Sequence, residues 1–261
     1  VETTPTASDE KIWRKHKNYV WKENIDPVNG TYLTNVTEAN DYFNWITGQP
    51  TTSKWQEISE ITRYNHYSVP LETKDINGNF ASSKMVDNWS KTSISGNARY
   101  TEMYYSGAEH LFNGNLEGEI MGVNNRSTAS AHTGKYSLDI TNAYSQAFRV
   151  TGTVGSSHAD HSKKFRPGKY KVSVWADRNT KVDQQIKLIF NGSTIPESSR
   201  VNAGQWIQLN YIVNLQPNSS ATLYFTNNSY TGNGHLYLDD FRMHPIYTAV
   251  NTYVYDEQTD A

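Results

Sequence analysis

Apolar and polar residues alternate along many short segments of this chain. Alternation places successive side chains on opposite faces, so each such segment predicts a half-buried β-strand. In the second half of the chain the predicted strands are 97–105, 135–140, 146–151, 167–175, 186–190, 207–211, 222–226 and 236–245. Turn signals such as Asn-Gly and Pro-Gly separate several of them. Short strands punctuated by turns at this spacing predict an all-β sandwich or jelly roll.

Shorter alternating segments occupy the first hundred residues. Residues 60–74 alternate and turn near Pro70, and an Asn-Gly pair at 77–78 marks the next turn. The basic and aromatic segment 12–21 has the composition of a strip that stacks on nucleic acid. Nearby acidic residues balance its charge, so we interpret it as a strand whose Lys and Arg side chains face water. The front of the chain therefore predicts a smaller β-rich module.

Composition supports this interpretation and narrows the possible partners. The chain has 261 residues, of which 36% are hydrophobic and 13% aromatic, a mixture typical of sheets with polar outer faces. A net charge of −2 gives no reason to expect nucleic acid or an anionic membrane as a partner. No apolar run approaches the ~20 residues of a membrane span. The absence of Cys excludes disulfides and thiolate chemistry.

The segment 236–245 predicts the strand that organises the rest of the chain. Leu236 and Leu238 alternate with Tyr237, and Asp239 and Asp240 stand side by side at its far end. Adjacent strand residues face opposite ways, so we expect one carboxylate to point to a buried or metal-bound position and the other to solvent. Pro245 closes the run, where a strand exit tolerates proline.

Four stretches in this order resemble a known family: 132–138, 167–175, 203–209 and the closing segment 236–245, with its aromatic, apolar, Asp-Asp signature. Together they resemble the carbohydrate-binding-module-like jelly rolls, and the resemblance covers residues 100–246. It implies a β-sandwich that holds a structural Ca²⁺. The implied ligands are Asp239, Glu109 or Glu117, and the carbonyl of Lys135. The alternative is that Asp239 and Asp240 simply form hydrogen bonds.

A second resemblance lies in the flanking segments. Residues 60–79, with a turn at 68–70 and another at Asn77-Gly78, resemble the hairpins of bacterial YD-repeat (Rhs-type) proteins, although Asn65 stands where Asp is usual. Residues 252–256 match the Tyr-Asp signature of the same family. This resemblance implies a sandwich inserted between, or capping, repeats of a much larger bacterial protein. One hairpin cannot bury its own face, so such repeats stack on their neighbours.

Carbohydrate sites place an aromatic ring against the apolar face of a sugar and flank it with polar groups. Trp175 and Trp206 lie on the faces of their strands opposite the predicted core, and we expect them to be sugar platforms. The residues expected to line the rim are Tyr144, Tyr230 and His235. The alternative is that these aromatic residues cover sheet edges or pack against the front module.

Catalysis is the least favoured interpretation. A glycosidase needs two carboxylates about 5 to 9.5 Å apart across one cleft, and Asp239 and Asp240 are expected to point apart. His158, Asp160 and His161 form the densest metal-like cluster, but no second His-carboxylate motif completes a zinc site. We therefore predict a protein that is not an enzyme.

These observations predict an all-β chain with a β-rich YD-repeat-like module at 1–99, a jelly-roll sandwich at 100–246 and the start of a further repeat at 247–261. The predicted function is non-catalytic: a calcium-dependent glycan-binding or adhesion module of a large secreted or cell-surface bacterial protein, beside neighbouring repeat domains of the same polypeptide. The first alternative is a purely architectural sandwich in the repeat shell of a toxin or adhesin. The second is a polysaccharide hydrolase.

Overall fold

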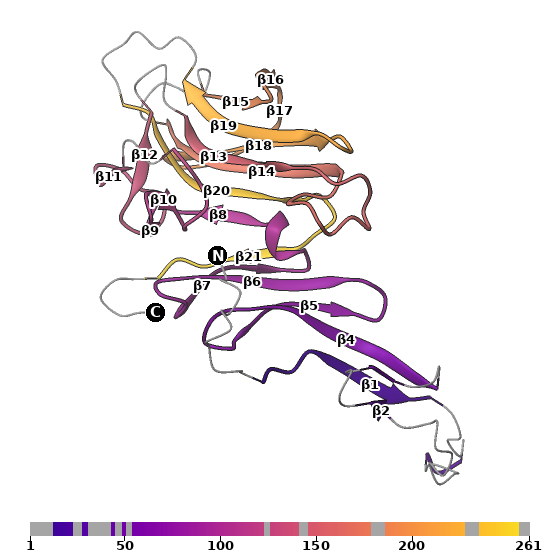
Figure 1. The fold of residues 1–261 in the computed structure, drawn as a ribbon. Coiled ribbons are helices and arrows are strands. Elements are labelled where there is room, and N and C mark those ends of the chain that lie inside the picture. Colours follow the sequence, from indigo (N-terminus) through magenta and orange to yellow (C-terminus); the bar gives the residue numbers. More distant parts are fainter. Residues whose placement is uncertain are drawn as a thin grey trace. The chain divides into compact units, whose positions relative to one another are not determined.

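The computed structural model describes residues 13–22, 28–30, 43–44, 49–50, 54–122, 126–140, 146–178, 186–227 and 235–255. The chain divides into two compact units, residues 1–80 and 81–261 (Figure 1). Strands dominate both units. In the described ranges, no helix has the length and apolar character that crossing a bilayer requires. Apart from one 3-10 turn at Tyr100–Glu102, the regular elements of the described residues are all β-strands, as the alternation pattern predicts.

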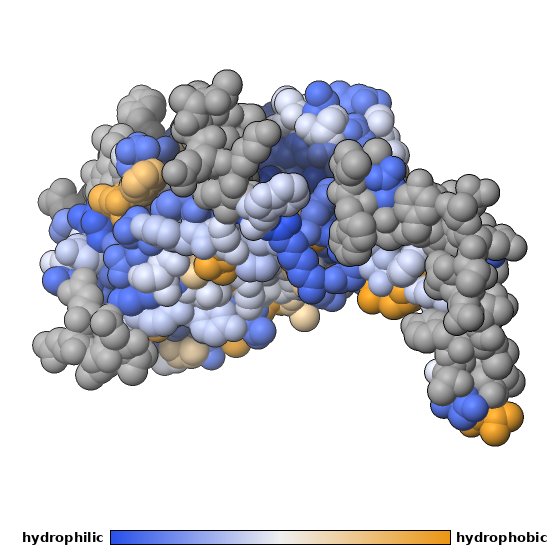
Figure 2. Space-filling view, turned by 60° about the horizontal axis from the view of Figure 1, so that its bottom comes forward, coloured by the Kyte–Doolittle hydropathy of each residue, from blue (hydrophilic) through white to orange (hydrophobic). Residues whose placement is uncertain are grey.

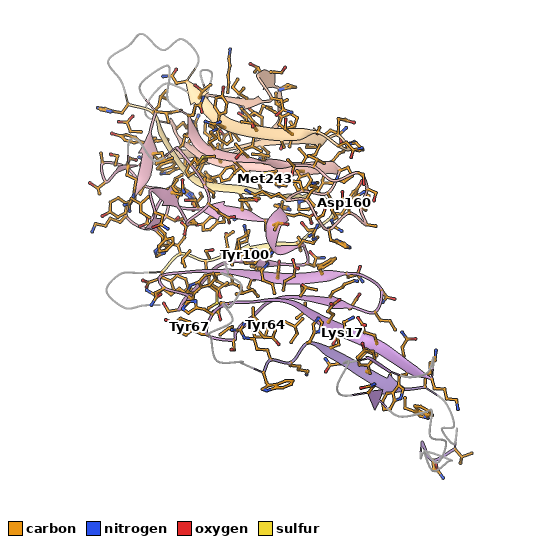
Figure 3. The ribbon with its side chains drawn as sticks, viewed as in Figure 1. Lys17, Tyr64, Tyr67, Tyr100, Asp160 and Met243 are labelled. Carbon is orange, nitrogen blue, oxygen red and sulfur yellow. The ribbon has the colours of Figure 1, made fainter. Side chains whose placement is uncertain are left out.

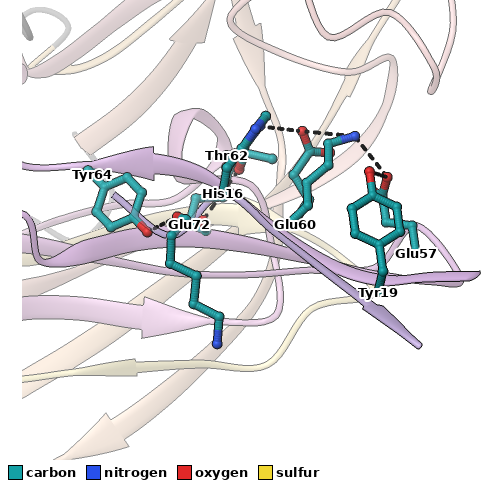
Figure 4. Close-up of polar contacts among 9 residues, drawn as sticks. His16, Tyr19, Glu57, Glu60, Thr62, Tyr64 and Glu72 are labelled. Carbon is teal, nitrogen blue, oxygen red and sulfur yellow. Dashed lines mark hydrogen bonds and ion pairs between the residues drawn. The ribbon is translucent and has the colours of Figure 1, made fainter. Parts of the chain in front are cut away.

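The first unit contains an antiparallel sheet in the order β1-β4-β5. Its described strands are β1 (Lys17–Trp21), β2 (Phe43–Asn44), β3 (Gln49–Pro50), β4 (Trp55–Tyr64) and β5 (Pro70–Asp75). On β1, the Lys17 Nζ lies 2.8 Å from Glu57 and 3.9 Å from Glu60 of β4 (Figure 4). Tyr19 donates to the same Glu57 carboxylate at 3.4 Å. The basic segment at the front is thus a strand whose Lys17 pairs with acidic residues of its neighbour.

Two Asx turns shape the hairpins of this unit. The side-chain oxygen of Asn65 accepts hydrogen bonds from the backbone N–H groups of Tyr67 and Val69, at 3.0 and 2.9 Å. Asp75 does the same for Asn77 and Asn79, both at 2.8 Å. Asn and Asp close turns in this way because their short polar side chains reach backbone donors two to four residues ahead. The predicted turns at 68–70 and 77–78 are therefore confirmed.

The second unit contains a β-sandwich of two antiparallel sheets. One sheet has the order β11-β12-β20-β14-β18-β17, with β8 also paired to β20, and the other has the order β13-β19-β15-β16. The strands of the first sheet are β8 (Tyr104–Ser106), β11 (Arg126–Ser127), β12 (Ser137–Asp139), β14 (Gly168–Asp177), β17 (Glu197–Ala203), β18 (Trp206–Leu215) and β20 (Tyr237–Pro245). Those of the second are β13 (Ala147–Thr153), β15 (Ile186–Phe190), β16 (Ser193–Ile195) and β19 (Ser220–Asn227).

The core of the sandwich comes from the inward positions of both sheets. Val172 and Val174 of β14 are fully buried, and Phe241 of β20 stacks on Phe148 of β13 with ring centroids 5.3 Å apart. In Figure 3, Met243 lies among these strands and Asp160 lies at one end of them. The predicted sandwich is confirmed because every second residue of β14 and β18 faces this core.

One predicted strand differs from the structure. Residues 97–105 were expected to form a single strand, but a 3-10 turn at Tyr100–Glu102 precedes the short strand β8. Glu102 is fully buried and accepts two hydrogen bonds from the guanidinium of Arg166, at 2.6 and 2.8 Å. A bidentate pair of this kind is strong when buried, and it holds the chain in the turn.

Outside the sandwich, strands β6, β7 and β21 are paired in this order, and the unit boundary falls at the start of β6. These strands are β6 (Phe80–Val86), β7 (Lys91–Gly96) and β21 (Val250–Thr252). Gly96 is the register partner of Val250, so the strand that precedes the sandwich pairs with the strand that follows it. The short pair β9 (Leu111–Phe112) and β10 (Asn115–Leu116) completes the described strands. The domain boundaries predicted at 99/100 and 246/247 stay predictions.

Candidate functional site

The strongest candidate site is the outward face of the central strands β18, β14 and β20. Trp175 lies near the end of the central strand β14, with Gln208 of β18 as its register partner on one side and Asp239 of β20 on the other. Val172 and Val174 point into the core, so Trp175 faces away from it, as predicted. On the face that Figure 2 shows, hydrophilic residues predominate and hydrophobic residues form small separate spots.

The segment 128–136, between β11 and β12, is attached to the sandwich by carboxylates. Asp239 Oδ2 accepts hydrogen bonds from the backbone N–H groups of His132 and Thr133, at 2.7 and 3.1 Å. Asp240 accepts from the Thr133 hydroxyl at 2.7 Å, and its other oxygen lies 2.6 Å from His132 Nδ1. Glu109 Oε1 accepts from the N–H groups at positions 135 and 136, each at 2.8 Å. The segment is therefore fixed to two separate elements.

The arrangement of Asp239 and Asp240 corrects the expectation that one of them meets solvent. Asp239 is fully buried and Asp240 is 6% exposed. The pairing of β20 with β14 shifts register between Ser173 and Trp175, and Asp240 has a left-handed backbone with φ of 47°. A bulge of this kind interrupts the strict alternation of a strand. Both carboxylates consequently reach the same segment, 128–136.

Burial raises the pKa of two groups that hold this segment in place, the Asp239 carboxyl and the Tyr105 phenol. Loss of solvent and the neighbouring charge of Asp240 raise the pKa of Asp239 well above its usual range, although three backbone N–H groups favour its ionised form. Tyr105 donates its hydroxyl proton to Asp240 Oδ1 at 2.6 Å, and burial followed by the charge of Asp240 raises the pKa of that phenol. All these contacts hold the segment in place.

His132 is brought against the predicted platform. Its ring stacks on Trp175 with centroids 4.0 Å apart and planes inclined by 14°, and it meets the edge of Trp206 at 5.4 Å. Trp175 is half-buried and Trp206 is 7% exposed. The three rings form a compact aromatic cluster, and Asp240 fixes the His132 ring at its Nδ1 atom.

Polar groups border this cluster. Asp177, at the end of β14, accepts a hydrogen bond from the Ser130 hydroxyl at 2.6 Å and another from the Gln205 amide at 3.0 Å. Gln208 lies beside Trp175 on β18. Amides and carboxylates next to an aromatic ring can hydrogen-bond the hydroxyl groups of a sugar, while the ring packs on its apolar face.

The predicted rim residues divide into described and undescribed positions. His235 is exposed, its Nδ1 lies 2.6 Å from Asp139, and its ring stacks on Tyr237 with centroids 5.7 Å apart. Tyr144 and Tyr230 lie outside the described residues. The structure therefore brings together Trp175 and Trp206, and places His235 on the segment that leads into β20.

The acidic residues proposed for calcium have different environments. Glu117 follows β10, and burial raises its pKa to about 8. Its Oε1 accepts a weak hydrogen bond from Ser106 at 3.4 Å, whereas its buried Oε2 has no hydrogen-bond partner among the described residues. The negative charge of Glu109 contributes to this raised pKa. An orphaned carboxylate oxygen is what a cation ligand would offer.

Other metal-like clusters are not completed by the structure. Within the described ranges, no group of three or more His, Asp or Glu side chains has a geometry that could hold a metal ion. Asp160 instead accepts hydrogen bonds from the backbone N–H and hydroxyl groups of Ser156 and Ser162. These bonds, led by that from the Ser162 hydroxyl, hold the pKa of Asp160 below its usual range. Its role between His158 and His161 is to close a loop.

Reasoning from the sequence missed three members of the site: His132 as a stacking partner, Gln208 and Asp177. Alternation alone assigns Asp177 to the same face as Trp175, and Gln208 to the same face as Trp206, so both could have been found. His132 could not, because its position depends on contacts that span more than a hundred residues.

Comparisons with known proteins show a distant structural similarity to carbohydrate-binding modules over about half of the chain. The CBM22-1 xylan-binding domain of Paenibacillus barcinonensis Xyn10C matches with 15% identity and a TM-score of 0.34, covering 54% of this chain and 92% of that one. A family 35 carbohydrate binding module from an environmental isolate matches with 15% identity and a TM-score of 0.34, covering 58% and 99%. No protein-family model and no curated protein matches the chain.

Proposed function

We propose that the second unit is a non-catalytic module that binds a glycan on the outward face of β18, β14 and β20. The observation that carries this proposal is the aromatic cluster of His132, Trp175 and Trp206, which is fixed by Asp240 and bordered by Gln208 and Asp177. A rigid aromatic surface loses little conformational freedom when a sugar packs against it, so preorganisation favours binding. The described residues of this face supply stacking and hydrogen-bonding groups.

The test is a glycan array followed by affinity electrophoresis with the polysaccharides that score on it. Trp175→Ala removes the central ring, and we expect it to weaken binding at least tenfold, because aromatic platforms supply much of the energy at such sites. Trp13→Ala is the matched control, since Trp13 is 94% exposed and belongs to the first unit. An array without hits for the wild-type protein, or equal binding by both variants, would refute the proposal.

We also propose that a structural Ca²⁺ supports this unit, with Glu117 and Glu109 as its acidic ligands and main-chain carbonyl oxygens, including that of Lys135, as the others. The support is the buried Glu117 Oε2 without a partner among the described residues. Calcium prefers several oxygen ligands of mixed carboxylate and carbonyl type. Asp239 fits this role less well because its oxygens already accept three N–H groups.

A second candidate function is architectural. Because β7 pairs with β21, residues 97–249 begin and end beside one another, between two neighbouring paired strands. That topology is expected of a domain inserted between two strands, and it supports a sandwich carried by YD-type repeats of a larger secreted or cell-surface protein, with neighbouring repeats of the same polypeptide as its partners. Under this proposal the sandwich is a spacer. We then expect a glycan array without hits, while the pairing of β7 with β21 still depends on the contacts at residues 96–97 and 249–250.

A further inference from the structure

A strip of basic side chains continues from Trp175 along the same outward face. Lys171 and Lys169 follow at alternate positions of β14, so they face the same side as Trp175, and both are exposed. Arg242 of β20 is the register partner of Ser173, which places it on this face between Trp175 and Lys171. At ~3.3 Å per residue, Trp175 to Lys169 spans about 20 Å. We call Lys169, Lys171 and Arg242 the basic strip.

No carboxylate neutralises the basic strip within the described part of the chain. None of its three members forms an ion pair with a described Asp or Glu. The carboxylates of this face that contact the segment 128–136, namely Asp177, Asp239 and Asp240, accept hydrogen bonds from residues 130–133, from Tyr105 and from position 205. The buried Nε of Arg242 has no described acceptor, while its Nη2 donates to Thr252 at 2.7 Å.

The strip adjoins the aromatic cluster on β14 and β20. His244 is the register partner of Lys171, and burial, with the positive charges of Arg242 and Lys171 contributing, lowers the pKa of its imidazole. Between Trp175 and Lys171 lie Ser173 and Asn210, which are register partners and are 3% and 4% exposed. Asn210 Oδ1 is buried without a hydrogen-bond partner among the described residues. The face thus carries a half-buried indole at one end and two exposed ammonium groups at the other, with buried polar groups between them.

We propose that the basic strip binds the anionic groups of an acidic polysaccharide whose sugar rings pack at Trp175. This inference rests on the proposed glycan-binding function and specifies its ligand class. Charge complementarity supports it: carboxylate or sulfate groups repeated along a chain would meet three cations that lack described carboxylate partners. A guanidinium and two ammonium groups are suited to such anions. A neutral polysaccharide would use Trp175 and leave the strip unpaired.

The experiment compares polygalacturonate, dextran sulfate and neutral dextran by affinity electrophoresis and calorimetry, at several salt concentrations. We expect the wild-type protein to bind an acidic polysaccharide more tightly than dextran, and binding to weaken as salt rises, because exposed charges are screened. The double variant Lys169→Gln/Lys171→Gln should lose about tenfold in affinity for the acidic polysaccharide and nothing for any neutral glycan found on the array. The double variant Lys169→Arg/Lys171→Arg keeps both positive charges and should bind the acidic polysaccharide as tightly as the wild-type protein does.

Lys163→Gln is the matched control, since Lys163 is exposed and lies in the loop before β14, outside the basic strip. Selective loss in the double variant alone supports the inference, and a preference for polygalacturonate or for dextran sulfate identifies carboxylate or sulfate as the recognised group. Equal wild-type affinity for acidic and neutral glycans would overturn the inference and leave glycan binding intact. Equally tight binding of single-stranded DNA would overturn it as well. Failure of the glycan-binding proposal is a different outcome: the Trp175→Ala variant would then bind glycan as well as the wild-type protein does.

Discussion

Asp240 adopts a left-handed backbone where β20 passes Trp175, and this one residue determines how the site is built. A positive φ in a residue other than Gly costs about 1–2 kcal/mol, so compensating contacts are needed. Asp240 has them: its carboxylate contacts Tyr105, Thr133 and His132. The left-handed conformation turns two adjacent carboxylates toward one segment, which an unbroken strand could not do.

The proposed calcium site depends on Glu117, so its effect on stability can be tested at this residue. We expect millimolar Ca²⁺ to raise the thermal unfolding midpoint by about 5 °C, because a ligand at a hundred times its Kd stabilises the folded state by ~2.7 kcal/mol. Glu117→Gln should abolish this rise. It should also be more stable than the wild type at high pH in chelator, since it removes a charge that burial disfavours. Differential scanning calorimetry measures both effects.

The control for that experiment is Glu197→Gln. Glu197 forms an exposed ion pair with Arg200 at 2.7 Å, far along the chain from the proposed ligands. Its replacement should leave the calcium response unchanged. A Glu117→Gln protein that still gains the full midpoint shift would exclude Glu117 as a ligand.

The lowered pKa of His244 predicts how the free energy of unfolding depends on pH. Burial, with the nearby charges of Arg242 and Lys171, lowers the pKa of this imidazole in the folded state. Below the usual His pKa of ~6.5 the unfolded chain therefore binds more protons than the folded one, so the free energy of unfolding falls as the pH drops. His244→Gln should flatten this decline between pH 7.5 and 5.5, as measured by urea midpoints. His158→Gln is the matched control, and an unchanged slope in His244→Gln would contradict the prediction.

At the scale of elements, the segment 128–136 is positioned by what it contacts rather than by its own conformation. It carries no regular structure, but its backbone donors meet Asp239 and Glu109, and its His132 ring meets Trp175. Buried backbone N–H groups need acceptors, and carboxylates satisfy several at once. The segment consequently holds one side chain against the sheet with the precision that a binding surface requires.

A substitution at Gly134 tests whether Glu109 holds the segment 128–136 in place. Gly134 has φ of 62°, and an added Cβ would lie 2.4 Å from Glu109 Oε1. Gly134→Ala should therefore destabilise the protein by about 2 kcal/mol or more, through backbone strain and displacement of Glu109. It should also weaken glycan binding because His132 moves. Urea unfolding and affinity electrophoresis measure the two effects.

Gly204 provides the matched control, since its φ is 63° and an added Cβ would meet nothing within 4 Å. Gly204→Ala isolates the cost of the left-handed backbone, about 1 kcal/mol. Equal losses in the two variants would show that the contact between Gly134 and Glu109 has no special role.

At the scale of the second unit, the chain of the sandwich begins after β7 and ends before β21, and these two strands pair with each other. Asn97 N donates to the Ala249 carbonyl at 3.3 Å, and the Asn97 side chain accepts from Ala249 N at 2.6 Å, which closes the point of departure and return. A short cluster of Ile94, Met103 and Tyr105, with Val250 packed against it, covers the junction. Inserted domains are tolerated where both ends lie close together.

A substitution at Gly96 tests whether the pairing of β21 with β7 depends on close contact at this residue. An added Cβ would lie 2.5 Å from the Ala249 carbonyl oxygen and 2.8 Å from Val250 Cγ1. Gly96→Ala should separate β21 from β7 and expose residues 246–255 to proteases, while the sandwich still folds and binds. Gly192→Ala, at a turn with open space around it, should leave β21 protected. Limited proteolysis with mass spectrometry distinguishes the outcomes, and protection of β21 in both variants would contradict the prediction.

Much of the fold and part of the site follow from local sequence. The alternation of Val172, Val174 and Trp175 assigns these side chains to inner and outer faces without any knowledge of neighbours, and the turns at Asn65 and Asp75 depend on nearby backbone groups. The expected exposure of one of the two adjacent Asp residues was wrong, because a register shift against another strand overrides alternation.

The sequence by itself determined that the chain is β-rich, where most of its strands lie and which face Trp175 occupies, because alternation and turn chemistry are local properties. Only the tertiary structure decided that Asp239 and Asp240 hold the segment 128–136, that His132 stacks on Trp175, and that β7 meets β21. These contacts join residues about 40 to 160 positions apart. Their formation depends on the register and packing of several strands together, and no local pattern encodes that.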